Sequence, residues 1–75
     1  MAEIEACYRA LGARIQIIRE AIGMTQEALA KKVGYTRTSL VNIEAGRQRL
    51  PMHQVEEIAR ALSSTPRHLI KGIWT

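Results

Sequence analysis

Apolar residues recur at intervals of three and four along this chain, and glycine or proline interrupts each run. That spacing places the apolar side chains of each run on one face of a helix. Strands would need apolar residues at every second position, a pattern that is scarce here. Aromatic residues, which favour strands, make up only 4% of the chain. We therefore expect an all-α fold, a compact bundle of five helices.

The longest apolar stripe predicts the first helix, over about residues 4–21. Gly23 follows as a C-terminal stop for this helix. Four residues at steps of four, three and four define its expected buried stripe: Leu11, Ile15, Ile18 and Ile22.

Two shorter helices follow, and each begins after a threonine. Thr25 and Thr36 offer a side-chain oxygen to the free N–H groups of a helix start. The second helix should run to about residue 32 and end at Gly34, in the left-handed conformation that glycine adopts at little cost. The third should span about residues 37–44. The second helix is expected to bury three residues: Ala28, Leu29 and Val33.

The last third of the chain predicts two further helices. Pro51 opens the fourth, at a position where its missing N–H group costs nothing. Thr65 caps the fifth and Pro66 begins it. The expected buried residues are Val55, Ile58, Ala59 and Leu62 in the fourth helix and Leu69, Ile70 and Ile73 in the fifth. No repeat or linker divides the 75 residues, so we expect a single domain over 1–75.

The positive charge is concentrated in one quarter of the chain. Lysine and arginine number 11 against seven acidic residues, which gives a net charge of +4. Residues 31–49 hold five of the bases and one acid, and the remainder is neutral. The five bases are Lys31, Lys32, Arg37, Arg47 and Arg49. A local basic patch of this kind favours a polyanionic partner.

Several function classes lack their residues in this sequence. Cys7 is the single cysteine, and His53 and His68 stand alone, so no metal site is expected. No catalytic carboxylate pair, Cys–His arrangement or glycine-rich phosphate loop is evident, so we expect neither an enzyme nor a cofactor or small-molecule ligand. No apolar run approaches the roughly 20 residues that span a bilayer, and the N-terminal residues do not resemble a signal peptide. These features predict a cytoplasmic protein that does not bind membranes.

The stretch from residue 25 to about 45 has the geometry of a helix-turn-helix. Two short helices flank the three-residue connection Gly34-Tyr35-Thr36. If Leu40 and Ile43 pack against the second helix, the opposite face of the third helix is short, polar and free of acids. The residues of that face are Arg37, Thr38, Val41, Asn42 and Ala45.

The ordered set of residues around this motif resembles the lambda-repressor-like family, the phage repressor and Cro type also called the XRE family. The resemblance covers about residues 11–70. It is carried by Thr25-Gln26-Glu27, Leu29-Ala30, Val33-Gly34, Thr36, Ser39, Ile43-Glu44, Gly46-Arg47, Ile58-Ala59 and Ala61-Leu62. The chain departs from the family at Leu50-Pro51-Met52, where a Ser or Thr cap is usual. The resemblance implies a five-helix fold and sequence-specific binding to double-stranded DNA, usually as a dimer on a palindrome.

The resemblance also assigns roles to individual residues. The third helix, about residues 36–44, would lie in the major groove. There Arg37 would bind guanine, Asn42 would pair with adenine, and Val41 would contact a thymine methyl group, with Thr38 beside them. Phosphate contacts are expected from Gln26, Thr36, Ser39, Arg47 and Arg49. Arg19 and Glu44 match positions that form an internal ion pair in some relatives.

The C-terminal segment, about residues 65–74, is the expected dimer interface. Its apolar residues are Leu69, Ile70, Ile73 and Trp74. The alternative is that Trp74 folds back onto the first helix as part of the core. A dimeric repressor would place its two third helices about 34 Å apart on a palindromic operator. A different interpretation keeps the same fold but makes a protein the main partner, as in an antitoxin that binds its toxin. A controller of a restriction–modification system would fit as well.

Overall fold

The computed structural model describes residues 2–74, and these residues form five helices and no strand. The all-α prediction is therefore confirmed. The helices are α1 (Ala2–Ala21), α2 (Gln26–Val33), α3 (Arg37–Glu44), α4 (Met52–Ala61) and α5 (Pro66–Ile70).

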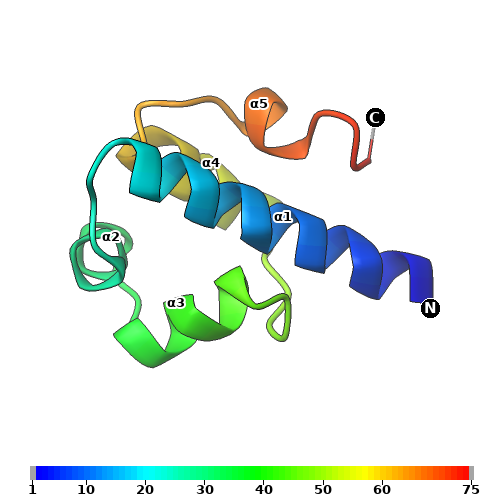
Figure 1. The fold of residues 1–75 in the computed structure, drawn as a ribbon, viewed down its shortest axis with the longest axis horizontal. Coiled ribbons are helices and arrows are strands. Elements are labelled where there is room, and N and C mark those ends of the chain that lie inside the picture. The colour runs from blue at the N-terminus through cyan, green and yellow to red at the C-terminus, as the bar shows by residue number, and fades with distance from the viewer. Residues whose placement is uncertain (1, 75) are drawn as a thin grey trace.

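Helix α1 is the longest element and organises the rest of the bundle. Helix α3 packs on one side of α1 and α5 on the other (Figure 1). Helix α2 packs against both α3 and α4, and α4 in turn packs against α5. Helices α2 and α3 follow each other through a tight turn and form the predicted helix-turn-helix. Helix α3 thus lies at an edge of the molecule and packs against α1 and α2 on its inner side.

The predicted helix ends are present in the backbone. The hydroxyl oxygens of Thr25 and Thr36 each accept a hydrogen bond of 3.0 Å from the N–H three residues later, and Thr65 does the same at 3.1 Å. Gly34 ends α2 with φ of +76°, the left-handed conformation expected there. Pro51 was expected to be the first residue of the fourth helix, and this prediction is wrong by one position: the backbone of Pro51 is extended, with ψ of 153°, so Pro51 is the N-cap and α4 begins at Met52.

The core contains the predicted apolar stripes, and residues from all five helices meet in it. The buried apolar residues are Leu11, Ile15, Leu29, Ala30, Leu40, Ile43, Leu50, Val55, Ile58, Ala59, Leu62 and Leu69. Four residues expected in the stripes lie at the edge of this core and remain partly exposed: Ile18, Val33, Ile70 and Ile73. Trp74, which one alternative assigned to the core, is 44% exposed.

Two residues that we expected to be buried are exposed. Ile22 is 50% exposed because α1 ends at Ala21, and the helical spacing no longer determines where the next side chain lies. Ala28 is exposed and Ala30 is buried in its place. The inward face of α2 passes through Leu29 and Ala30, and Ala28 is rotated about 100° from Leu29, away from the core.

Helices α1 and α3 approach so closely that only glycine fits between them. A Cβ atom on Gly12 would lie 2.3 Å from the carbonyl oxygen of Ile43 and 2.6 Å from that of Glu44. Both atoms belong to the backbone of α3, so neither can rotate away. This contact fixes the C-terminal end of α3 against α1.

Candidate nucleic-acid interface

The two faces of α3 differ in burial as the sequence predicted. Leu40 and Ile43 are buried in the core, towards α1 and α2. Arg37 and Thr38 are exposed, and Val41 and Asn42 are partly exposed. No acidic residue lies on this outward face, because Glu44, the one acid of α3, is buried. Helix α3 therefore presents a polar face with a basic residue at its N-terminal end.

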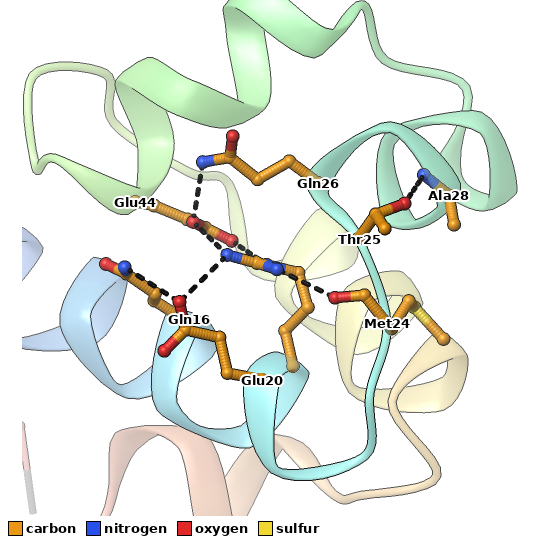
Figure 2. Close-up of polar contacts among 8 residues, drawn as sticks. Gln16, Glu20, Met24, Thr25, Gln26, Ala28 and Glu44 are labelled. Carbon is orange, nitrogen blue, oxygen red and sulfur yellow. Dashed lines mark hydrogen bonds and ion pairs between the residues drawn. The ribbon is translucent and has the colours of Figure 1, made fainter.

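A buried ion pair holds the C-terminal end of α3 to α1. Arg19 donates from Nε to Glu44 Oε2 at 2.7 Å and from Nη2 to Oε1 at 3.1 Å (Figure 2). The third nitrogen, Nη1, donates to the carbonyl oxygen of Met24 at 2.7 Å. The hydrogen bonds that Arg19 donates to Glu44, together with the negative charge of Glu44, raise the pKa of Arg19 above its usual value, although burial acts against this. The ion pair implied by the family resemblance is thus confirmed.

Gln26 joins this network from the first turn of α2. Its Nε2 donates to Glu44 Oε1 at 3.0 Å (Figure 2). An amide nitrogen carries two hydrogens, so this bond orients the side chain and leaves one N–H for another acceptor. Within residues 2–74 no buried side-chain nitrogen or oxygen lacks a hydrogen-bond partner. The network therefore links α1, α2 and α3 through three side chains.

The remaining residues expected at phosphates lie near the two ends of α3. Thr36 and Ser39 belong to its N-terminal turn, where the Thr36 oxygen caps the Ser39 N–H. Arg47 and Arg49 are exposed in the loop that follows α3. Arg47 Nε donates to the side-chain oxygen of Asn42 at 3.1 Å. An Asn that pairs with adenine uses both its oxygen and its N–H, so this bond has to open or be shared when Asn42 meets a base.

Arg49 contacts an aromatic pair, Tyr8 and Trp74, for which the sequence indicated only that Trp74 could fold back onto the first helix. Its guanidinium carbon lies 5.8 Å from the centre of the Tyr8 ring. Trp74 packs edge to face on Tyr8, with ring centres 5.2 Å apart and an interplanar angle of 72°. The residues in these contacts are far apart in the chain, so no local sequence pattern predicts the contacts.

The expected dimer residues do not form one exposed surface. Leu69 is fully buried, so its side chain belongs to the core of the protomer, and the prediction that places it on a partner surface is wrong. Ile70 and Ile73 are partly exposed, and Trp74 is 44% exposed although it touches α1 through Tyr8. A shallow depression of about 290 Å³ next to Trp74 is lined by Tyr8, Leu50, Pro51, Met52, Val55, Ile70 and Trp74.

Two other kinds of site are absent from the part of the chain that the structure describes. No group of three or more metal-ligating side chains is present there. No helix among residues 2–74 has the length and apolar character needed to cross a bilayer.

A helix-turn-helix whose second helix exposes a polar, acid-free face beside arginines is the architecture of a DNA-binding domain. The model of the family described as "Helix-turn-helix domain" matches residues 10–70, and the chain belongs to this family. Within it the chain has the lambda-repressor-like fold of the XRE type, and it is a transcriptional regulator with a helix-turn-helix DNA-binding domain.

Curated relatives carry the same description. An HTH-type transcriptional regulator from Archaeoglobus fulgidus is 41% identical over 51 residues, which are 68% of this chain and 73% of the relative. Another, from Methanothermobacter thermautotrophicus, is 43% identical over 44 residues, which are 59% of this chain. In this second case the match spans 64% of the length of the relative.

Solved structures of similar proteins agree on the fold. The restriction-modification controller protein C.AhdI from Aeromonas hydrophila is 31% identical and superposes with a TM-score of 0.81, over 85% of this chain and 97% of its own. The clp gene regulator ClgR from Corynebacterium glutamicum superposes with a TM-score of 0.83, over 85% of this chain and 82% of its own. At 23% identity, ClgR supports the fold alone.

Proposed function

We propose that this protein is a sequence-specific repressor that binds a palindromic DNA operator as a homodimer. The observation that carries the proposal is the outward face of α3, which is polar and free of acids while its inward face is fully packed. Helix α3 is about 12 Å long, and the major groove is about 12 Å wide and admits an α-helix.

Four residues on this face are the proposed base readers: Arg37, Thr38, Val41 and Asn42. Arg37 is exposed at the first position of α3, where its guanidinium can reach both acceptors of a guanine. Asn42 lies five residues later, and its amide has the donor and the acceptor that adenine requires. Val41, beside Asn42, offers methyl groups to thymine.

Phosphate contacts are proposed at both ends of α3. Gln26, Thr36 and Ser39 lie towards its N-terminal end, and Arg47 and Arg49 follow its C-terminal end. The backbone N–H groups of the first turn of α2 reinforce the contact at Gln26. A helix in the major groove has a phosphate backbone on each side, so contacts at both ends fix its depth and its register.

Dimerisation is proposed through the C-terminal segment and the adjacent start of α4. Met52 and Trp74 are large apolar residues that remain exposed, and both line the same depression. Ile70 lines the same depression and Ile73 is partly exposed in the same segment, whereas Leu69 is buried in the core. The likeness to the controller protein C.AhdI is compatible with a restriction–modification role, and a toxin bound at the same surface is the alternative partner.

The proposed function is tested by selecting bound duplexes from a random DNA library at near-physiological salt. We expect an enriched palindrome with half-sites about one helical turn apart. A library that shows no enrichment would contradict DNA reading by this chain. That result would favour the alternative function, a protein-binding module with the same fold whose partner binds around Trp74.

A further inference from the structure

A second basic feature lies where α1 crosses the loop of residues 45–51. A Cβ atom on Gly46 would lie 2.5 Å from Cγ and 2.6 Å from Cα of Arg9, so the loop and α1 are in direct contact. A cleft of about 360 Å³ lies at this crossing. It is lined by Glu5, Tyr8, Arg9, Ala45, Gly46, Arg47 and Arg49.

The charge of this cleft is positive and is not neutralised by the fold. Three arginines and one glutamate line it. The ion pairs recorded among residues 2–74 are those of Arg19 with Glu20 and Glu44, so none of the three cleft arginines is paired with a carboxylate there. A concave site lined by unpaired guanidinium groups binds phosphate oxygens well, because each guanidinium presents several fixed donors.

Two of the three arginines are oriented by contacts within the protein. Arg47 is held by its hydrogen bond to Asn42 of α3. Arg49 lies over the ring of Tyr8, and Trp74 packs on the same ring edge to face. Tyr8 therefore limits the positions open to Arg49, which reduces the entropy that a ligand contact would have to overcome.

We propose that this cleft binds a phosphate of the DNA backbone beyond the C-terminal end of α3, with Arg9 as a contact supplied by α1. Tyr8 is the positioning residue for Arg49. The proposal rests on the proposed function and deepens it, because it adds a backbone contact outside the helix-turn-helix. Arg9 also lies outside residues 10–70, which the family model matches.

The DNA backbone is favoured over a free phosphate ion by the position and openness of the site. Arg9, Arg47 and Arg49 are all exposed, so the cleft does not enclose a small anion. It adjoins the end of α3 through the Asn42–Arg47 bond, at the side where the major groove ends in a phosphate backbone. Glu5 lies in the same cleft and repels a phosphate, so Glu5→Gln should raise DNA affinity.

The test is the salt dependence of binding to a mixed-sequence duplex and to a duplex enriched from the random library. The logarithm of the DNA-binding constant falls linearly with the logarithm of the salt concentration, and losing one phosphate contact makes this negative slope shallower by about 0.9. We expect this change for Arg9→Ala on both duplexes. Arg60→Ala is the matched control, since Arg60 is an exposed arginine on α4 and does not line the cleft. Its slope should equal that of the parent protein.

The role of Tyr8 is tested separately by two substitutions. Tyr8→Leu removes the ring under Arg49 and should weaken binding about two- to fivefold, whereas Tyr8→Phe keeps the ring and should restore the affinity. Circular dichroism and thermal unfolding identify any variant that fails to fold. If Arg9→Ala does not fold, the salt dependence is measured instead on Arg9→Gln, which keeps a polar side chain at this exposed position.

The outcomes separate this inference from the proposed function. If the parent protein binds no duplex, the proposed function fails and this inference fails with it. If the parent binds but Arg9→Ala and Arg9→Gln keep its slope, the inference alone is overturned. A titration with inorganic phosphate distinguishes the other source of the ligand. Saturable phosphate binding together with an unchanged DNA slope would assign the cleft to a free anion and overturn the DNA contact.

Discussion

Arg19 of α1 and Glu44 at the end of α3 form a two-point ion pair, with 2.7 Å between Nε and Oε2 and 3.1 Å between Nη2 and Oε1. The two side chains are only 7% and 3% exposed. The pair therefore ties the proposed DNA-reading helix to the longest helix in an environment shielded from water. Replacing either side chain by an apolar one would leave the other as a buried charge without its partner.

We expect Arg19→Met and Glu44→Leu each to lower the free energy of unfolding by about 3–5 kcal/mol. The double variant should lose less than the sum of the two, because two apolar groups replace two charges. Urea unfolding of the four proteins measures this coupling. Glu20→Gln is the control, since Glu20 is 59% exposed and lies 3.8 Å from Arg19, and it should cost under about 1 kcal/mol. Additive losses in the double variant would contradict the account.

Gly12→Ala should destabilise the protein by about 1–3 kcal/mol, because the new Cβ would overlap the backbone of α3. The sign of the change is informative, since the same substitution at an exposed helix position stabilises by about 0.5–1 kcal/mol. Thermal and urea unfolding measure it directly. DNA affinity should fall as well, because α3 has to move away from α1. A more stable variant would show that the two helices do not touch at Gly12.

The raised pKa of Tyr35 predicts that the free energy of unfolding decreases at high pH. Burial raises the pKa of its phenol, and the negative charge of Glu57 raises it further, while the hydroxyl donates to the side-chain oxygen of Gln54. The folded state therefore holds this proton more tightly than the unfolded chain does. The contribution of Tyr35 is fully present below about pH 10, the usual tyrosine pKa, and is lost as the pH rises through the higher folded value.

Tyr35→Phe should accordingly be less stable at neutral pH by about 0.5–1.5 kcal/mol, through loss of the hydrogen bond to Gln54. Above about pH 10 the difference from the parent protein should shrink. Urea unfolding at both pH values checks this. An equal difference at the two pH values would mean that the Tyr35 phenol has the same pKa in the folded and unfolded states.

Trp74→Ala should shift the protein from dimer to monomer, because it removes the largest exposed side chain of the proposed dimer surface. Sedimentation equilibrium measures the dissociation constant. Ile17→Ala is the control, since Ile17 is exposed on α1 and does not line the depression beside Trp74. An unchanged dissociation constant for Trp74→Ala would place the dimer interface elsewhere.

Local patterns were sufficient to predict the helices and the two faces of α3. Threonine caps, the left-handed Gly34 and the spacing of Leu40 and Ile43 depend on residues close together in the chain, and all are present as expected. The Arg19–Glu44 pair joins distant residues, and only the family resemblance indicated it.

Contacts between distant segments were missed. The crossing of Arg9 over Gly46 joins parts of the chain that no periodicity relates. For Trp74 the sequence left two positions open, and one of them was against the first helix, where Tyr8 lies. A glycine inside the α1 pattern, Gly12, was the one available signal of a close helix contact. Leu69 shows the converse limit, because an apolar residue near a chain end has the same pattern whether it packs inside the protomer or against a partner.

Methylation interference tests most directly whether the outward face of α3 reads bases in the major groove. Dimethyl sulfate marks guanine N7 in the major groove and adenine N3 in the minor groove. On the enriched duplex we expect interference at guanine N7 in each half-site. Arg37→Ala should abolish it at one guanine of each half-site and cost about 1–3 kcal/mol of binding. Asn42→Ala should relax selection at one adenine instead. Interference confined to adenine N3, or an unchanged guanine pattern in Arg37→Ala, would contradict the account.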